Sequence, residues 1–287
     1  MNDNPSALVL KKPAAITLNG STPEAETVVR DRERFGDRVS ATLTSRHKDV
    51  AAESAALASS TKGLTQTHDS IELSGEVRDH LTSSLREELE RQMVTFELTV
   101  PFGSRVISPP YDEEWAAGSA LAFGAKIDGK FSVLAADEPS SGAIGVYLTV
   151  DRPADVAITP GGTFGFTCLA AQNMPALRST GGLGLMAYVD DNPQPALERE
   201  AMLWNVNGLS LTTSFSGSGQ ISQAHSPPVG LGPVYLAPLI ISMKPGHRYL
   251  IWVWGWQVSS QTQGFLGLLN VDMPFVTVDA GPPLVIG

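Results

Sequence analysis

One stretch of the sequence, YLIWVWGWQV at residues 249–258, limits what this chain can fold into. Three of the five tryptophans, Trp252, Trp254 and Trp256, are spaced by two within it. In a β-strand this spacing places all three indoles on one face, because successive side chains point to opposite sides. The other face is also apolar, with Tyr249, Ile251 and Val253. A strand that is apolar on both faces is typical of a core, so we expect most of this row to be buried.

The end of this strand is the part that we expect to reach the surface. Trp256 is the last indole of the row and is followed by Gln257. Trp115 follows an acidic run that includes Asp112 and Glu113 and is the second exposed candidate. Indole rings offer flat apolar faces on which sugar rings can stack. These five residues are therefore the predicted binding surface.

The composition divides the chain near residue 95. Phe35 is the only aromatic residue before this point, and all the tryptophans and tyrosines follow it. The prolines and glycines of residues 1–23 predict an extended N-terminal arm. Residues 24–95 form a polar helical region, and residues 96–287 have the aromatic, glycine and proline content of strands and turns.

The helical region carries a one-position heptad. Residues seven apart fall in one register: Val29, Gly36, Leu43, Val50, Leu57, Leu64 and Ile71. The second position of each heptad is small or polar, which is typical of a slender oligomeric stalk. We therefore predict that these apolar residues form a homo-oligomerisation seam, with a trimer as the first expectation. The alternative is an irregular helix that lies on its own domain. A second amphipathic segment at 76–93 either continues the rod or folds back as a hairpin.

From Val94 onward the apolar period changes to two, and turn residues recur between short apolar runs. Asp128-Gly129 is a two-residue hairpin signal. The turn at 244–247 predicts that the strand at 249–258 pairs with the strand just before it. No helix-length segments separate the strands, which argues against a parallel α/β sheet. The predicted fold class is α+β: an N-terminal helical stalk or hairpin followed by an antiparallel, jelly-roll-like β-sandwich.

Several classes of function are disfavoured by composition and motifs. A net charge of −10 argues against nucleic-acid binding, which needs clustered Lys and Arg. The single cysteine, Cys168, excludes an intrachain disulfide or a cysteine-based zinc site, and its apolar neighbours predict an inert buried thiol. No catalytic residue, metal site or cofactor is predicted, because no hydrolase elbow, P-loop or zinc-protease motif is present. The acidic runs are expected to be solvated turns; calcium binding and a glycosidase carboxylate pair are the alternatives.

The sequence lacks a signal peptide and a membrane-spanning apolar stretch, so we expect a soluble cytoplasmic product, a location compatible with later export on a particle. A helical stalk with a β head is a layout shared with phage tail fibres and other particle-borne proteins, although no specific family motif is present. The predicted function is a non-enzymatic structural or adhesion, receptor-binding subunit whose partners are copies of itself, other subunits of an assembly or a glycan. The alternatives are a lectin or glycoside-active enzyme, and a toxin-like protein with rearranging helices.

Overall fold

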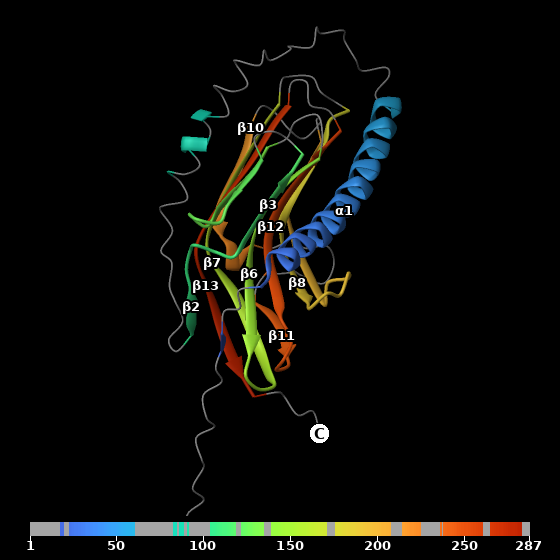
Figure 1. The fold of residues 1–287 in the computed structure, drawn as a ribbon. Helices are drawn as coiled ribbons and strands as arrows, with labels where there is room; N and C mark the ends of the chain where they lie inside the picture. The colour runs from blue at the N-terminus through green and yellow to red at the C-terminus, as the bar shows by residue number, and fades with distance from the viewer. Residues whose placement is uncertain are drawn as a thin grey trace, which may run out of the picture.

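The computed structural model describes residues 18–19, 23–60, 83–84, 86–88, 91, 104–118, 122–134, 139–170, 176–207, 214–224, 236, 238–260 and 265–282. One long helix is followed by two antiparallel β-sheets that pack as a sandwich (Figure 1), which confirms the predicted fold class. The helix α1 spans Ala25–Ser60. The strands are β1 (Leu18–Asn19), β2 (Arg105–Ile107), β3 (Glu113–Ala117), β4 (Phe123–Ala125), β5 (Lys130–Leu134), β6 (Ser140–Val150), β7 (Ala154–Ala170), β8 (Arg178–Val189), β9 (Leu197–Asn207), β10 (Ser214–Gln220), β11 (Leu239–Met243), β12 (Tyr249–Ser259) and β13 (Phe265–Gly281).

The strand order is that of a jelly roll. One sheet has the order β1-β6-β12-β8-β9, with β3 also paired to β6, and the other has the order β10-β7-β13-β5-β4, with β11 on β7 and β2 on β13. Four strands of each sheet form the two facing layers of the sandwich: β6-β12-β8-β9 in one sheet and β5-β13-β7-β10 in the other. The chain passes back and forth between these layers, as in the two Greek keys of a jelly roll.

The aromatic strand β12 lies in the middle of its sheet, between β6 and β8, and is buried along its whole length. Its Tyr249, Ile251 and Val253 face joins the main core between the two sheets. The predicted pairing with the preceding strand is wrong, because β11 pairs with β7 in the opposite sheet. The turn at 244–247 therefore carries the chain from one sheet to the other.

The hairpin predicted at Asp128-Gly129 is present, with a longer loop than expected. Ala125 of β4 lies opposite Lys130 of β5, so residues 126–129 form the connection. Gly129 adopts a φ of +69°, a left-handed conformation that favours glycine.

The glycines of β8 make room for indole rings. A Cβ added at Gly181 would lie 2.0 Å from the ring of Trp204, and one added at Gly184 would lie 2.2 Å from Nε1 of Trp254. Real side chains do not approach so closely, so each glycine leaves the space that a neighbouring indole fills. The glycine-rich run of β8 is therefore a packing motif of the sheet.

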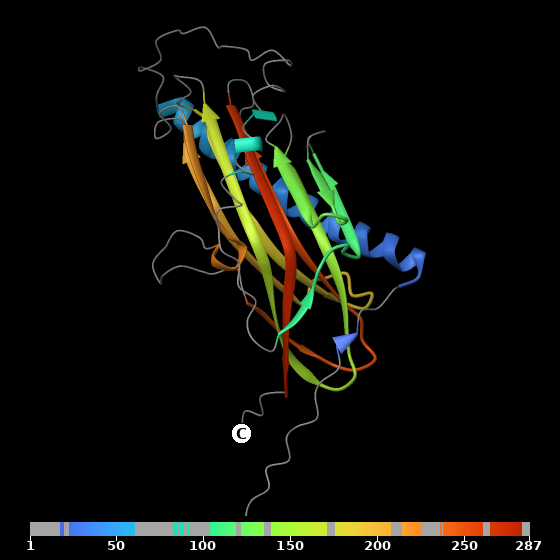
Figure 2. The ribbon, with the colours of Figure 1, turned by 90° about the vertical axis from the view of Figure 1, so that its left-hand side faces the viewer.

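The helix α1 covers the tryptophan row. It crosses the outer face of the sheet that contains β12 obliquely (Figures 1 and 2). Its buried apolar side chains form a second core with the three indoles of β12 and with aromatic residues of β6 and β8. The apolar side chains that α1 contributes are Phe35, Val39, Leu43 and Val50. A sheet that is apolar on both faces needs such a cover, so α1 does not project from the sandwich as a stalk.

The heptad positions are divided between several environments. Leu43 and Val50 are buried against this chain's own sheet, so the predicted oligomerisation seam is wrong for these two residues. Val29 is 54% exposed, and Leu57 is partly buried. Leu64, Ile71 and most of the second predicted helix lie outside the described residues. Self-association of the chain stays a prediction, as do the domain boundaries at residues 23 and 95.

Candidate binding cleft

Two aromatic contacts fix the first half of α1 on the sheet. The ring of Phe35 stacks on Trp252 with centroids 4.2 Å apart and an angle of 15° between the planes. Its edge meets Trp115 of β3 at 5.2 Å, so one phenylalanine joins two strands. Offset and edge-on aromatic pairs stabilise a core beyond the area that they bury. This half of the interface has the character of a closed core.

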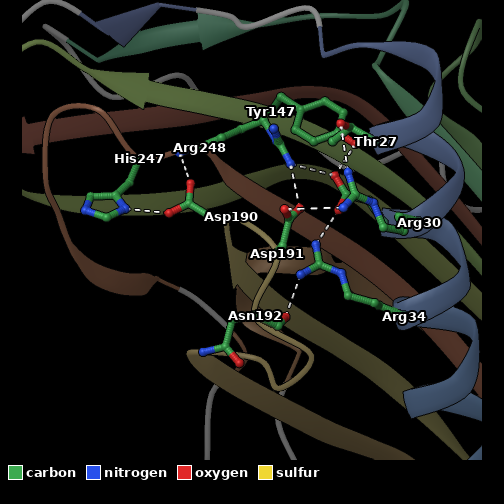
Figure 3. Close-up of polar contacts among 10 residues, drawn as sticks. Thr27, Arg30, Arg34, Tyr147, Asp190, Asp191, Asn192, His247 and Arg248 are labelled. Carbon is green, nitrogen blue, oxygen red and sulfur yellow. Dashed lines mark hydrogen bonds and ion pairs between the residues drawn. The ribbon is translucent and has the colours of Figure 1, made fainter.

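A buried carboxylate adds a polar anchor to the same half of α1. Asp31 is 1% exposed and accepts a hydrogen bond of 2.8 Å from the Tyr147 hydroxyl of β6. It also pairs with Arg34 on its own helix and with Arg248 at 3.4 Å. Figure 3 shows that Tyr147, Arg34 and Arg248 come from three separate parts of the fold. A buried charge is tolerated only when it is paired and hydrogen-bonded. Asp31 therefore has a structural role.

The turn after β8 extends this polar network towards solvent (Figure 3). Asp190 accepts a hydrogen bond of 2.8 Å from the backbone N–H of Arg248 and lies within hydrogen-bonding distance of His247 Nδ1. Burial alone raises the pKa of Asp190, but the contacts with His247 and Arg248 outweigh it and hold the pKa below its ordinary value. Asp191 pairs with Arg30 at 3.4 Å. These contacts join the start of α1 to one end of the sandwich.

Ion pairs between helix arginines and sheet glutamates continue along α1. Arg38 pairs with Glu198 of β9 at 2.7 Å, and Arg46 pairs with Glu200, two residues further along the same strand. The Arg46 guanidinium also lies 3.7 Å above the centre of the Trp256 ring, which is cation–π geometry. In the first half of α1, Phe35 stacks on Trp252, whereas in the second half Arg46 stacks on Trp256.

A cleft of about 310 Å³ opens beside this arginine, between α1 and the sheet. The helix contributes Asp49 and Glu53, which lie one turn apart, together with Arg46 and Val50. The sheet contributes Thr180 of β8, Trp256 of β12, and Glu200, Met202 and Asn205 of β9. The wall therefore combines an indole with several hydrogen-bonding groups, a composition common in small-molecule sites.

Three polar atoms in the wall of the cleft are buried and have no hydrogen-bond partner: Nε1 of Trp256, one terminal nitrogen of Arg46 and Oε1 of Glu200. Burial raises the pKa of Glu200 above its ordinary value, and its contact with Arg46 opposes this increase only in part. Buried polar groups without a partner cost free energy, so each one calls for an explanation. The indole N–H groups of Trp252 and Trp254 lack partners in the same way inside the closed part of the core, so this feature alone does not mark a ligand site.

The structure separates the predicted binding residues. Trp256 is 1% exposed, so the expectation that it reaches the surface is wrong; it nevertheless lines the cleft beneath Arg46. Gln257 is buried, and Trp115 packs against Phe35. Glu113 is buried and pairs with Arg32, while Asp112 accepts a hydrogen bond of 2.7 Å from the Tyr147 N–H. Among these five residues, only Trp256 belongs to the cleft.

The helix and β9 supply the cleft residues that sequence reasoning missed. Arg46, Asp49 and Glu53 read as the solvated face of a polar helix, and Glu200 reads as one charge in an ordinary strand. Nothing in the local pattern indicates that residues 154 positions apart form an ion pair. The available signal was the two-sided apolar strand β12, which requires an amphipathic element on its outer face.

Other kinds of chemistry receive little support from the part of the chain that is described. No group of three His, Cys, Asp or Glu side chains there could hold a metal ion. Cys168 is buried as expected, and burial raises the pKa of its thiol well above the ordinary value. A thiol in this state is a poor nucleophile. The cleft beside α1 is therefore the site considered for ligand binding.

These features define a class of protein: a jelly-roll sandwich with a helix over one sheet and a polar cleft between them. No family model matches the chain, and no curated protein matches it significantly. TmCBM61, a carbohydrate-binding module solved in complex with β-1,4-galactotriose, is 13% identical with a TM-score of 0.19, over 63% of this chain and 90% of that chain. The structure of infectious bursal disease virus Gx strain is 11% identical with a TM-score of 0.18, over 62% of this chain and 39% of that chain. Both similarities are weak and concern the β-sandwich fold alone.

No described helix is both long and apolar enough to cross a membrane.

Proposed function

We propose that this protein is a non-enzymatic adhesion or receptor-binding subunit of a larger assembly, and that it binds a saccharide in the cleft beside α1. The jelly roll supplies a rigid frame, and α1 supplies half of the binding wall. A site held between two packed elements is more firmly positioned than one on loops.

One observation carries this proposal: the cleft between α1 and the sheet, whose wall combines the polar side chains of Arg46, Asp49 and Asn205 with the apolar side chain of Met202. A saccharide hydroxyl both donates and accepts hydrogen bonds, so neighbouring hydroxyls can pair with the carboxylate, carboxamide and guanidinium groups that line the cleft. The partly exposed Met202 side chain offers apolar surface to the C–H groups of a sugar ring. The volume of about 310 Å³ lies at the lower end of the range for small-molecule pockets, which fits a short saccharide segment.

Self-association of the chain would place several such clefts in one assembly. Linking several weak sites raises overall avidity by about 10²–10⁴-fold when their geometry allows simultaneous contact. Light scattering on the whole chain measures the number of copies. A monomer at micromolar concentration would contradict the self-association part of the proposal and leave the cleft proposal standing.

The binding proposal is tested with a glycan array followed by calorimetry on the best saccharide. Changing Glu200 to Ala removes one of the carboxylates that line the cleft. We expect affinity to fall at least about tenfold, since a hydrogen bond to a charged group contributes roughly 1.5–3 kcal/mol.

Glu198 provides a matched control. It lies on the same strand, pairs with an arginine of the same helix, and has a side-chain exposure of 21% against 22% for Glu200, but it does not line the cleft. Glu198→Ala should leave saccharide affinity within about twofold of the parent protein. An array without any binding, or equal losses in the two variants, would refute saccharide binding at this cleft.

A glycoside hydrolase is the second candidate. Glu200 has a raised pKa and shares the cleft with Asp49 and Glu53, and glycosidases combine a carboxylic acid of raised pKa with an ionised carboxylate. Against this reading, Arg46 binds Glu200 and favours its ionised form. Release of reducing ends from a bound oligosaccharide, abolished in Glu200→Gln, would favour the enzyme over the adhesin.

A further inference from the structure

The charges around the cleft are unbalanced. Three carboxylates line it, from Asp49, Glu53 and Glu200, against the single guanidinium of Arg46. Arg46 is already paired with Glu200. Arg178, at the margin, lies 3.3 Å from Glu53. Among the described residues Asp49 has no ion-pair partner, so the cleft keeps an uncompensated negative charge.

The two helix carboxylates are well placed to act together on a ligand. Asp49 and Glu53 are four residues apart on α1, so they project from the same face. The carboxylate of Glu200 lines the same cleft from β9. A ligand that enters between them therefore meets acceptors on two sides.

We infer that the cleft selects saccharides that carry an ammonium group, such as hexosamines, binds neutral saccharides less tightly, and excludes uronic and sialic acids. This inference rests on the proposed saccharide binding and names the ligand class of that site. An ammonium group donates up to three hydrogen bonds and is attracted by the carboxylates, whereas a ligand carboxylate would be repelled by them. A neutral amide or hydroxyl keeps the hydrogen bonds and loses the charge attraction.

The test compares three oligosaccharides of equal length, built from glucosamine, N-acetylglucosamine or galacturonic acid, by calorimetry on the full chain. The buffer has low salt and is acidic enough to keep the glucosamine amine protonated. We expect the glucosamine oligomer to bind most tightly and the galacturonate oligomer to show no measurable binding. Galacturonate affinity equal to or above that of glucosamine would overturn the inference and leave saccharide binding intact. Absence of binding for all three would refute saccharide binding as well.

A matched pair of double variants separates the cleft from the general negative charge of the chain. Asp49→Asn with Glu53→Gln neutralises the helix wall of the cleft. Glu33→Gln with Asp37→Asn makes the same change of charge on exposed residues of α1 that do not line the cleft. The first pair should lower glucosamine affinity about fivefold or more and the second less than about twofold, since water and salt screen distant charges. Equal losses in the two pairs would assign the preference to net charge and overturn the inference.

Discussion

Replacing Phe35 with alanine removes the side chain that seats α1 on the tryptophan row. The Phe35 ring is fully buried, stacked on Trp252 at 4.2 Å, and in edge contact with Trp115 and Trp254. Removing a buried phenylalanine costs about 3–5 kcal/mol through lost transfer free energy and the cavity left behind. The aromatic pairs place this site in the upper part of that range, so we expect a loss of about 4 kcal/mol.

Urea-induced unfolding, followed by tryptophan fluorescence and circular dichroism, measures this loss from the midpoint and slope of the transition. The control is Val29→Ala on the same helix, at a position that is 54% exposed. We expect the control to change the free energy of unfolding by less than about 0.5 kcal/mol. If Phe35→Ala costs no more than Val29→Ala, then α1 does not pack on the sheet and the account of the second core is wrong.

Two further predictions concern the sheet. Gly181→Ala should destabilise the fold by about 1–3 kcal/mol because its Cβ would overlap the Trp204 ring, whereas Gly281→Ala, with no atom within 4 Å, should be neutral in the same urea titration. Burial raises the folded-state pKa of Glu113, and Arg32 opposes this only in part, so ionised Glu113 destabilises the fold at neutral pH. As pH falls through the folded pKa towards the ordinary value of 4.5, protonation relieves this penalty, and the parent protein should gain stability relative to Glu113→Gln; a relative loss over that pH range would contradict the sign.

The sandwich could be predicted from the sequence because its signals are local. Alternation with a period of two, frequent turns and a two-sided apolar strand are each visible within a short window. The order of the strands depends on contacts between distant segments. The turn at 244–247 illustrates this limit: it resembles a hairpin turn locally, but β11 and β12 each find better partners in opposite sheets.

The place of α1 could not be predicted from its heptad. The buried side chains of α1 are Asp31, Phe35, Val39, Leu43 and Val50, of which the first four are spaced by four. The heptad positions are spaced by seven and share only Leu43 and Val50 with this set. The four-residue spacing and the seven-residue heptad are both present on this polar helix. The tryptophan face of β12 determines which side chains of α1 become buried. The cleft follows from this packing, so its residues could not be identified until the partner of α1 was known.

The helix α1, which covers the tryptophan row of β12, is synthesised before that row. Asp31 of α1 and its partner Arg248, which directly precedes β12, are 217 residues apart, so the ribosome synthesises the helix long before the sheet that it covers is complete. Until then α1 has only four buried apolar side chains to hide, and the charged residues on its other faces keep it in water. We expect the tryptophan row to pack soon after its synthesis, because the helix that covers it is already part of the emerged chain. This sequence of events shortens the time during which three adjacent indoles are exposed to aggregation.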